Sequence, residues 1–147
     1  MVPAAPVRRK PWHQSEMTSQ LLFGETVRIL KQKGSLWVKV RSLHDDYEGW
    51  MTTTLLQGIK EDDAKVYSDY VSTGFLNVVH LNESKIRIPM GASLPGFLDG
   101  RGKINGSIFH LEGEYHNRKE QRLEAGTVNH LTAQWLNAPY LWGGRTI

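Results

Sequence analysis

Residues 36–51, LWVKVRSLHDDYEGWM, decide the fold of this chain. The first six alternate between an aliphatic set and a set of larger or charged side chains. These two sets are Leu36, Val38 and Val40, and Trp37, Lys39 and Arg41. Such alternation is typical of a strand with one buried face. An acidic loop follows, and Gly49, Trp50 and Met51 indicate a return strand. The stretch therefore predicts a pair of strands in a small antiparallel barrel, since closure removes exposed strand edges.

The residues before this stretch predict one more strand and its turn. TVRIL at 26–30 alternates, with Val27 and Ile29 on one face and Arg28 on the other. KQKGS at 31–35 carries Gly34 and predicts the hairpin loop that leads into residue 36.

The second half of the chain repeats the strand pattern. Its strand candidates are FLNVVHL at 75–81, KIRIPM at 85–90 and SIFHLEGEY at 107–115. Pro89 marks the end or the edge of a ladder. Residues 91–106 are rich in loop residues, and Asn105-Gly106 predicts a tight turn. The chain is therefore expected to hold two small β units of about sixty residues each. A unit of this size has a marginal core, so it is stabilised by packing against a neighbour.

Two segments depart from the strand pattern. KEDDAKVYSDYV at 60–71 predicts a connector whose acidic residues at 61–63 begin a helical turn. After Gly126, the apolar side chains of Val128, Leu131 and Trp135 follow the spacing of a helix. Thr127 is the expected N-cap, and the helix should stop at Asn137 and Pro139. The chain is therefore expected to be mainly β with one short C-terminal helix.

Composition limits what the chain can do. It has 147 residues and no cysteine, which excludes disulfides, thiolate metal sites and a cysteine nucleophile within it. The net charge is +3, but basic residues are spread among carboxylates, and RRK at 8–10 is the one basic run. That distribution disfavours nucleic acid as a partner. No segment has the ~20 apolar residues that a membrane span needs, and no export signal is visible at the start.

The sequence resembles a family at several specific motifs. In the first half these are PVR at 6–8, SEM at 15–17, QLLFGE at 20–25, WVKV at 37–40 and YEGW at 47–50. They resemble the first bacterial SH3-like barrel of NlpC-type cysteine peptidases with two such barrels before the catalytic domain. MGASLP at 90–95 is similar to the second barrel, and TAQWLNAPYLWGGRTI at 132–147 is similar to the start of the catalytic domain. The resemblance implies two tandem SH3-like barrels at 1–60 and 61–125, followed by a truncated catalytic domain at 126–147.

The resemblance also implies which reaction the family catalyses, and it implies that residues 1–147 do not carry out this reaction. The family hydrolyses the bond between γ-D-glutamate and the diamino acid of cell-wall peptides. Its cysteine and histidines lie beyond Ile147, so no catalytic residue is assigned, and no cofactor or metal is expected. The histidines at 80, 110, 116 and 130 are interpreted as surface or strand residues. Residues 1–147 should therefore not cleave a free muropeptide. Family members of this architecture without export signals resemble cytosolic recycling enzymes, which favours a cytoplasmic location.

Three residues match the family's substrate-binding positions. Glu16 and Tyr47 match groups of the first barrel that bind the free amine of the peptide's L-alanine, and Tyr140 matches a tyrosine that lines the active site. A carboxylate suits an ammonium because a charge-assisted hydrogen bond is strong. Glu16 is alternatively an ordinary surface carboxylate, Tyr47 a cover for the barrel end, and Tyr140 a packing aromatic. Trp12 stands where a smaller residue is expected, so it crowds the groove or adds a wall to it.

Three functions remain open at this point. The first is the non-catalytic, substrate-recognising region of a cell-wall peptidase whose partner is the missing catalytic domain. The second is a stand-alone SH3-like module that binds a peptide or the cell wall without cleaving it. The third is a basic nucleic-acid adaptor, whose binding would fall steeply with salt.

Overall fold

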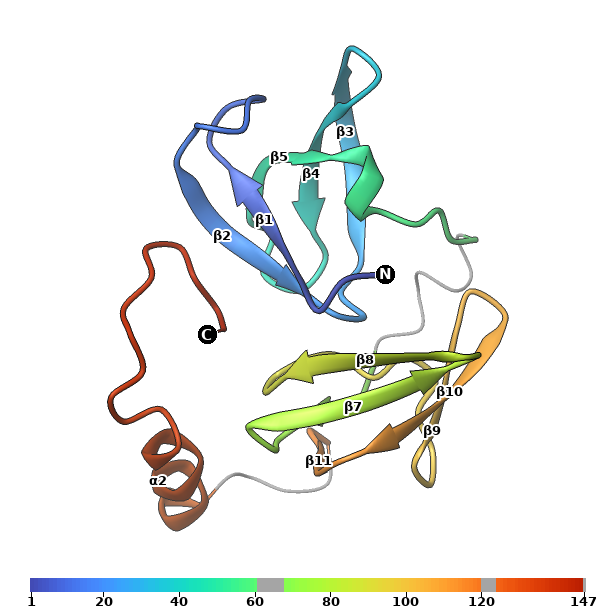
Figure 1. Cartoon of the computed structure of the whole chain (residues 1–147), viewed down its shortest axis with the longest axis vertical. Helices are drawn as coiled ribbons and strands as arrows, with labels where there is room; N and C mark the ends of the chain where they lie inside the picture. Colours follow the sequence, from blue (N-terminus) through green and yellow to red (C-terminus); the bar gives the residue numbers. More distant parts are fainter. Residues whose placement is uncertain (61–67, 120–123, 147) are drawn as a thin grey trace.

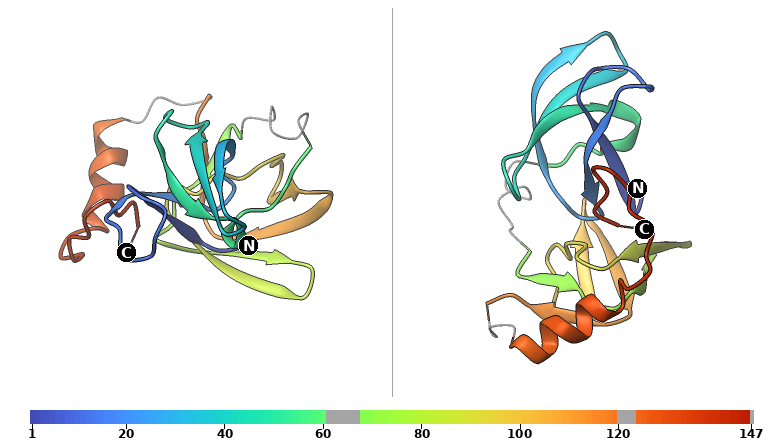
Figure 2. Two further views of the ribbon diagram at one scale, coloured as in Figure 1. Left: turned by 90° about the horizontal axis from the view of Figure 1, so that it is seen from above. Right: turned by 90° about the vertical axis from the view of Figure 1, so that its left-hand side faces the viewer.

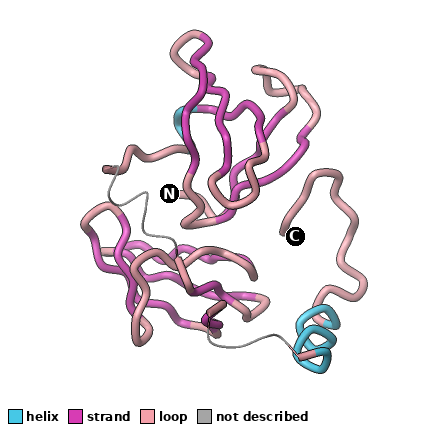
Figure 3. The backbone as a smooth tube through the Cα atoms, turned by 180° about the vertical axis from the view of Figure 1, so that it is seen from behind, coloured by secondary structure: helices cyan, strands magenta, loops and turns pink. Residues whose placement is uncertain are grey.

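The computed structural model describes residues 1–60, 68–119 and 124–146, and the predicted acidic turn at 61–63 lies outside them (Figure 1). The described part is mainly β with one short C-terminal α-helix, as the sequence predicts. Figure 3 shows strands and loops over most of the described backbone, in which helix occurs at η1 (Thr53–Leu55) and α2 (Ala125–Ala133). No described helix is long and apolar enough to cross a membrane.

The first unit is a five-stranded antiparallel sheet that curves around its own core (Figure 1). Its strands are β1 (Ala4–Arg8), β2 (Met17–Leu22), β3 (Val27–Lys33), β4 (Trp37–Ser42) and β5 (Glu48–Thr52), in the order β2-β1-β5-β4-β3. The 3-10 helix η1 (Thr53–Leu55) follows β5. The buried face predicted for residues 36–41 is confirmed at Val38 and Val40, which lie in the core with Val7, Leu21 and Met51.

The predicted inner face of residues 26–30 is wrong at Ile29. Its side chain is 58% exposed, and Leu36, expected on the buried face of the next strand, is also exposed. The reason is position: β3 is an edge strand, and its pairing with β4 shifts register between Ile29 and Lys31. Leu36 precedes the first residue of β4 and belongs to the hairpin turn. Alternation alone does not reveal which strand of a sheet lies at its edge.

The second unit contains two small sheets. The larger has the order β8-β7-β10-β9 and consists of β7 (Leu76–Leu81), β8 (Ser84–Pro89), β9 (Arg101–Ile104) and β10 (Ser107–Glu112). The smaller pairs β6 (Tyr70–Ser72) with β11 (Tyr115–Asn117). The tight turn at Asn105-Gly106 is confirmed, because these residues join β9 to β10 with φ of 48° and 81°.

Two strands of the second unit lie where the sequence predicts other structure. β6 occupies the end of the predicted connector at 60–71, and β9 occupies the end of the predicted loop at 91–106. Both are short, with three and four residues, so the period of alternation has no room to show. Each forms only because a partner strand is available: β11 for β6 and β10 for β9.

The two units meet through the turn that follows β2. Leu22 and Phe23 belong to the buried cluster of the second unit, which is centred on Phe109. The backbone N–H of Ser93 donates to the carbonyl of Phe23 at 3.0 Å. Gly24 adopts φ +77°, and a Cβ there would lie 2.1 Å from the Ser93 carbonyl oxygen. The first unit therefore supplies part of the second unit's core, and glycine is required where their backbones touch.

The helix α2 (Ala125–Ala133) lies beside the second unit, and the chain then returns to the first (Figures 1 and 2). The predicted N-cap Thr127 is wrong: the helix begins two residues earlier, Glu124 is its N-cap, and no side chain caps it. It also ends before Asn137, giving way to tight turns. Trp135 stacks edge-on against Phe75 at 5.8 Å and donates its indole N–H to the Met90 sulfur. That contact holds the end of the helix on the second unit.

Candidate functional site

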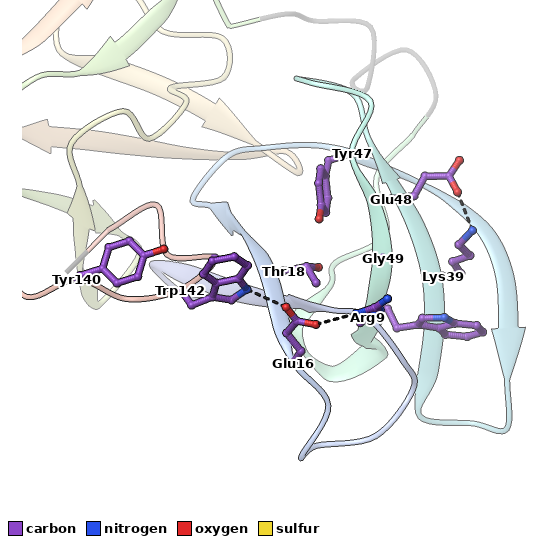
Figure 4. A pocket seen from close by; sticks show the side chains of 11 residues that line it. Arg9, Glu16, Thr18, Lys39, Tyr47, Glu48, Gly49, Tyr140 and Trp142 are labelled. Carbon is purple, nitrogen blue, oxygen red and sulfur yellow. Dashed lines mark hydrogen bonds and ion pairs between the residues drawn. The ribbon is translucent and has the colours of Figure 1, made fainter.

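A cavity of about 610 Å³ lies between the first unit and the C-terminal segment, residues 138–146 (Figure 4). Glu16, Tyr47 and Tyr140, the three residues predicted from the sequence, all line it. Glu16 precedes β2, Tyr47 precedes β5, and Tyr140 comes from the C-terminal segment. The fold thus brings together side chains separated by up to 124 positions (140 minus 16).

Glu16 is fixed at the base of a closed loop. The N–H of Arg9 donates to the carbonyl of Glu16 at 3.0 Å, and the buried Ser15 hydroxyl accepts the N–H of Lys10 at 2.9 Å. These bonds hold residues 9–16 as a pinned turn between β1 and β2. The carboxylate of Glu16 is thereby placed at the rim of the cavity, where it remains partly exposed.

The Glu16 carboxylate already has two partners. Its Oε1 accepts the indole N–H of Trp142 at 2.8 Å, and its Oε2 accepts Arg9 Nη1 at 3.2 Å (Figure 4). Neither partner is predicted from the sequence as a site residue. Trp142 stands two residues after Tyr140 in the same aromatic motif, which is the one signal that points to it. Arg9 lies in the RRK run, and its type alone does not distinguish a solvated cation from an ion-paired one.

Tyr47 is positioned by the turn between β4 and β5. Asp46 adopts φ +57°, and the Tyr47 N–H donates to Asp45 Oδ1 at 3.2 Å. Burial opposes ionisation of Asp45, but the hydrogen bonds from Ser42 and from the Tyr47 backbone outweigh it and lower its pKa. An ionised Asp45 keeps this turn closed. The Tyr47 phenol then points across the cavity on the side of Thr18 (Figure 4).

An ion-paired group forms the wall opposite Glu16. Glu48 accepts Lys39 Nζ at 2.6 Å through Oε2 and Arg41 Nη2 at 2.6 Å through Oε1. The hydrogen bond from Lys39, followed by that from Arg41, lowers the pKa of Glu48, and Glu48 in turn raises the pKa of Arg41. Glu48 is therefore paired with two cations of its own strand pair, whereas Glu16 is bonded to Arg9 and Trp142.

The Glu48 pairs predict a pH-dependent contribution to stability. A carboxylate whose pKa is depressed in the folded state stabilises the fold above its unfolded pKa, about 4.3, and loses that contribution as pH falls through the folded pKa. Glu48→Gln should thus lower the urea midpoint slightly at pH 7 and by less near pH 3. Glu83→Gln, in the exposed β7–β8 turn, is the control and should have no effect at either pH. A constant difference for Glu48→Gln across this range would contradict the assignment.

The remaining tryptophans and histidines discussed for the sequence differ in whether they line the cavity. Trp50, on the return strand predicted from the sequence, lines the cavity and is half-buried. Trp12 is exposed and does not line it, so it neither crowds the pocket nor walls it. The four interpreted histidines lie on strands or on the helix, and none lines the cavity: His80, His110, His116 and His130. Among the described residues, no cluster of three or more His, Asp or Glu could hold a metal ion.

The comparison with known protein families gives a match within the first unit. Residues 7–56 match the family model of the bacterial dipeptidyl-peptidase SH3 domain, which is less than half of the chain. This stretch runs from β1 through β5 and contains Glu16 and Tyr47. The chain therefore contains an SH3-like domain of the kind associated with bacterial peptidases, and that domain is a non-catalytic module. No curated protein is similar enough to the whole chain to count as a match.

Proposed function

We propose that this chain is the substrate-recognising, non-catalytic SH3-like region of a γ-D-glutamyl-L-diamino acid endopeptidase that acts on cell-wall peptides. The observation that carries the proposal is the shared cavity of Glu16, Tyr47 and Tyr140, walled largely by a peptidase-associated SH3-like domain. Its ligand is the peptide L-Ala-γ-D-Glu-diamino acid with a free N-terminal amine. Hydrolysis belongs to a catalytic domain that the described residues do not contain.

The chemistry of Glu16 supports recognition of an ammonium. Each carboxylate oxygen can accept more than one hydrogen bond, so the contacts to Trp142 and Arg9 leave acceptor capacity. The Tyr47 hydroxyl supplies a further acceptor in the same cavity. Arg9 neutralises part of the Glu16 charge when the pocket is empty, and an arriving ammonium competes with it. An amine acylated by sugar offers no positive charge, so the site should reject it.

The C-terminal segment supports a catalytic domain as the partner. Tyr140 is 84% exposed, Trp142 is 62% exposed and Leu141 is 52% exposed, and Leu136, two residues before this segment, is 74% exposed. Large apolar side chains exposed close together in the chain indicate an interaction surface. We place the catalytic domain of the peptidase on this surface, next to the cavity, so that the amine end of the peptide lies in the SH3-like domain and the scissile bond lies beyond it.

The test is a calorimetric titration of L-Ala-γ-D-Glu-diaminopimelate into the wild-type chain and Glu16→Gln. Loss of a charge-assisted bond weakens binding about 10- to 100-fold, so Glu16→Gln should bind correspondingly more weakly. The N-acetylated peptide should bind both proteins poorly. Glu83→Gln is the matched control, because it removes an exposed carboxylate far from the cavity. Equal affinity for the free and acetylated peptides in the wild type, or an unchanged affinity in Glu16→Gln, would refute the proposal.

A further inference from the structure

Glu25 is a buried carboxylate outside the cavity. It follows β2, and its side chain is 1% exposed. Its Oε2 accepts the backbone N–H of Leu22 at 2.9 Å. A carboxylate this deeply buried needs a cation as well, since one hydrogen bond does not compensate for lost hydration.

Arg145 of the C-terminal segment supplies that cation. Its Nη2 lies 2.7 Å from Glu25 Oε1 and its Nη1 lies 2.8 Å from Glu25 Oε2, the fork arrangement that fixes both groups in one orientation. Two more bonds join Arg145 to Gln20 of β2. The guanidinium donates to the Gln20 carbonyl at 2.9 Å, and the Arg145 backbone N–H donates to the Gln20 amide oxygen at 2.8 Å. One residue is thus attached to the first unit at four points.

The path from this attachment to the cavity is short and tight. Gly143 adopts φ +70°, and a Cβ there would lie 2.5 Å from the carbonyl oxygen of Met17. The backbone therefore runs against β2 between Arg145 and the cavity. Trp142 comes next and places its indole N–H on Glu16 at 2.8 Å. Because Trp142 is itself largely exposed, burial does not hold it there.

We infer that Glu25 and Arg145 form a latch that positions Trp142 against Glu16 and so builds the C-terminal wall of the pocket. Arg145 does not line the cavity, so it acts through Trp142 and is a positioning residue. The use of this wall in peptide binding rests on the proposed function, but the position of Trp142 does not. Without the fork, the segment loses its one bidentate ion pair to the first unit, and the bonds named above that remain are the Arg145 backbone N–H to Gln20 and the exposed Trp142 indole to Glu16. These single hydrogen bonds are weaker than the fork, so the segment should separate from β2.

The test is the NMR signal of the Trp142 indole N–H, assigned by its loss in Trp142→Phe. In the wild type this signal should be shifted by its carboxylate acceptor, and in Arg145→Ala it should move to the position of a solvent-exposed indole. Arg145→Lys, which keeps the charge but not the fork, should restore part of the shift. Arg28→Ala is the matched control, because it removes an exposed arginine from β3. The indole signal of Trp37 reports whether the first unit stays folded.

A second variant keeps the test decisive if Arg145→Ala alone disturbs the fold. Glu25→Gln/Arg145→Ala removes both charges and leaves no uncompensated buried charge, and it should also release Trp142. An unchanged Trp142 signal in the folded single or double variant would overturn the latch. Peptide titration is read separately: with the latch broken, affinity should fall about tenfold, as for one lost charge-assisted bond. If the wild type binds no peptide, the proposed function is wrong. The latch is still tested in that case, because the Trp142 indole signal does not depend on peptide binding.

Discussion

Replacing Gly24 with alanine should loosen the junction of the two β units and lower the stability of the whole chain. The new Cβ would lie 2.1 Å from the Ser93 carbonyl oxygen and 3.0 Å from Pro95 Cδ. Ser93 cannot move away freely, because its N–H is bonded to the Phe23 carbonyl. Left-handed backbone strain adds about 1–2 kcal/mol and overpacking about 1–3 kcal/mol. We expect a loss of about 2–5 kcal/mol in the free energy of unfolding, measured by urea denaturation.

Gly34→Ala separates the clash from the backbone strain. Gly34 has φ +62° in the β3–β4 hairpin, and a Cβ there would meet nothing within 4 Å. Its cost should be the strain alone, about 1–2 kcal/mol. The difference between the two variants then measures the contact between the units. If both lower the urea midpoint equally, the contact at Ser93 contributes nothing, and the description of a shared core is wrong.

Local signals made much of the fold predictable. Residues 36–41 alternate because β4 lies inside its sheet with one face on the core, and Asn105-Gly106 specifies its turn because both residues tolerate positive φ. Ile29 misled the prediction because its alternation is the same as that of a core strand, while its place at the sheet edge depends on strand order. β6 and β9 escaped prediction because three or four residues hold no measurable period.

The sequence suggested residues that the fold brings to one cavity, but it did not suggest their bonding partners. Glu16, Tyr47 and Tyr140 were chosen by resemblance to a family, and the fold places all three at one cavity. Glu16 is bonded to Arg9 and Trp142, and neither bond follows from the sequence around Glu16. The bond to Trp142 spans 126 positions. Contacts at such separation depend on the path of the chain after α2, which no local pattern records.

The bonding partner of Glu25 is likewise not predictable from the local sequence. In the sequence Glu25 is one of the acidic residues near a strand end, with no feature that sets it apart from Glu48. In the structure Glu48 is bonded to Lys39 and Arg41 of the neighbouring strand, whereas Glu25 is bonded to Arg145 and is shielded from solvent. Substitution of these two glutamates should therefore have different effects, although their local sequence context is similar. Loss of Glu48 changes a partly exposed pair of small energetic weight, and loss of Glu25 disconnects a distant segment.

Phe109→Ala should have the largest effect on stability of any single change considered. The side chain is fully buried on β10, where it meets Phe23 edge-on at 6.0 Å and stacks on Phe97 at 6.3 Å. Gly102, opposite it on β9, leaves room for the ring, since a Cβ there would lie 2.1 Å from it. Truncation of a buried phenylalanine costs about 3–5 kcal/mol, a large share of the ~5–15 kcal/mol typical of a folded protein.

The effect should extend to the first unit, because Phe23 enters this core from the turn after β2. We therefore expect the urea transition of Phe109→Ala to move to much lower denaturant, and the Trp37 indole signal of the first unit to broaden with it. Ile108→Ala is the matched control. Ile108, the neighbour of Phe109 on the same strand, is 62% exposed, and its truncation should cost less than about 0.5 kcal/mol. If Phe109→Ala leaves the first unit's signals sharp while the second unit unfolds, the two units do not depend on a common core.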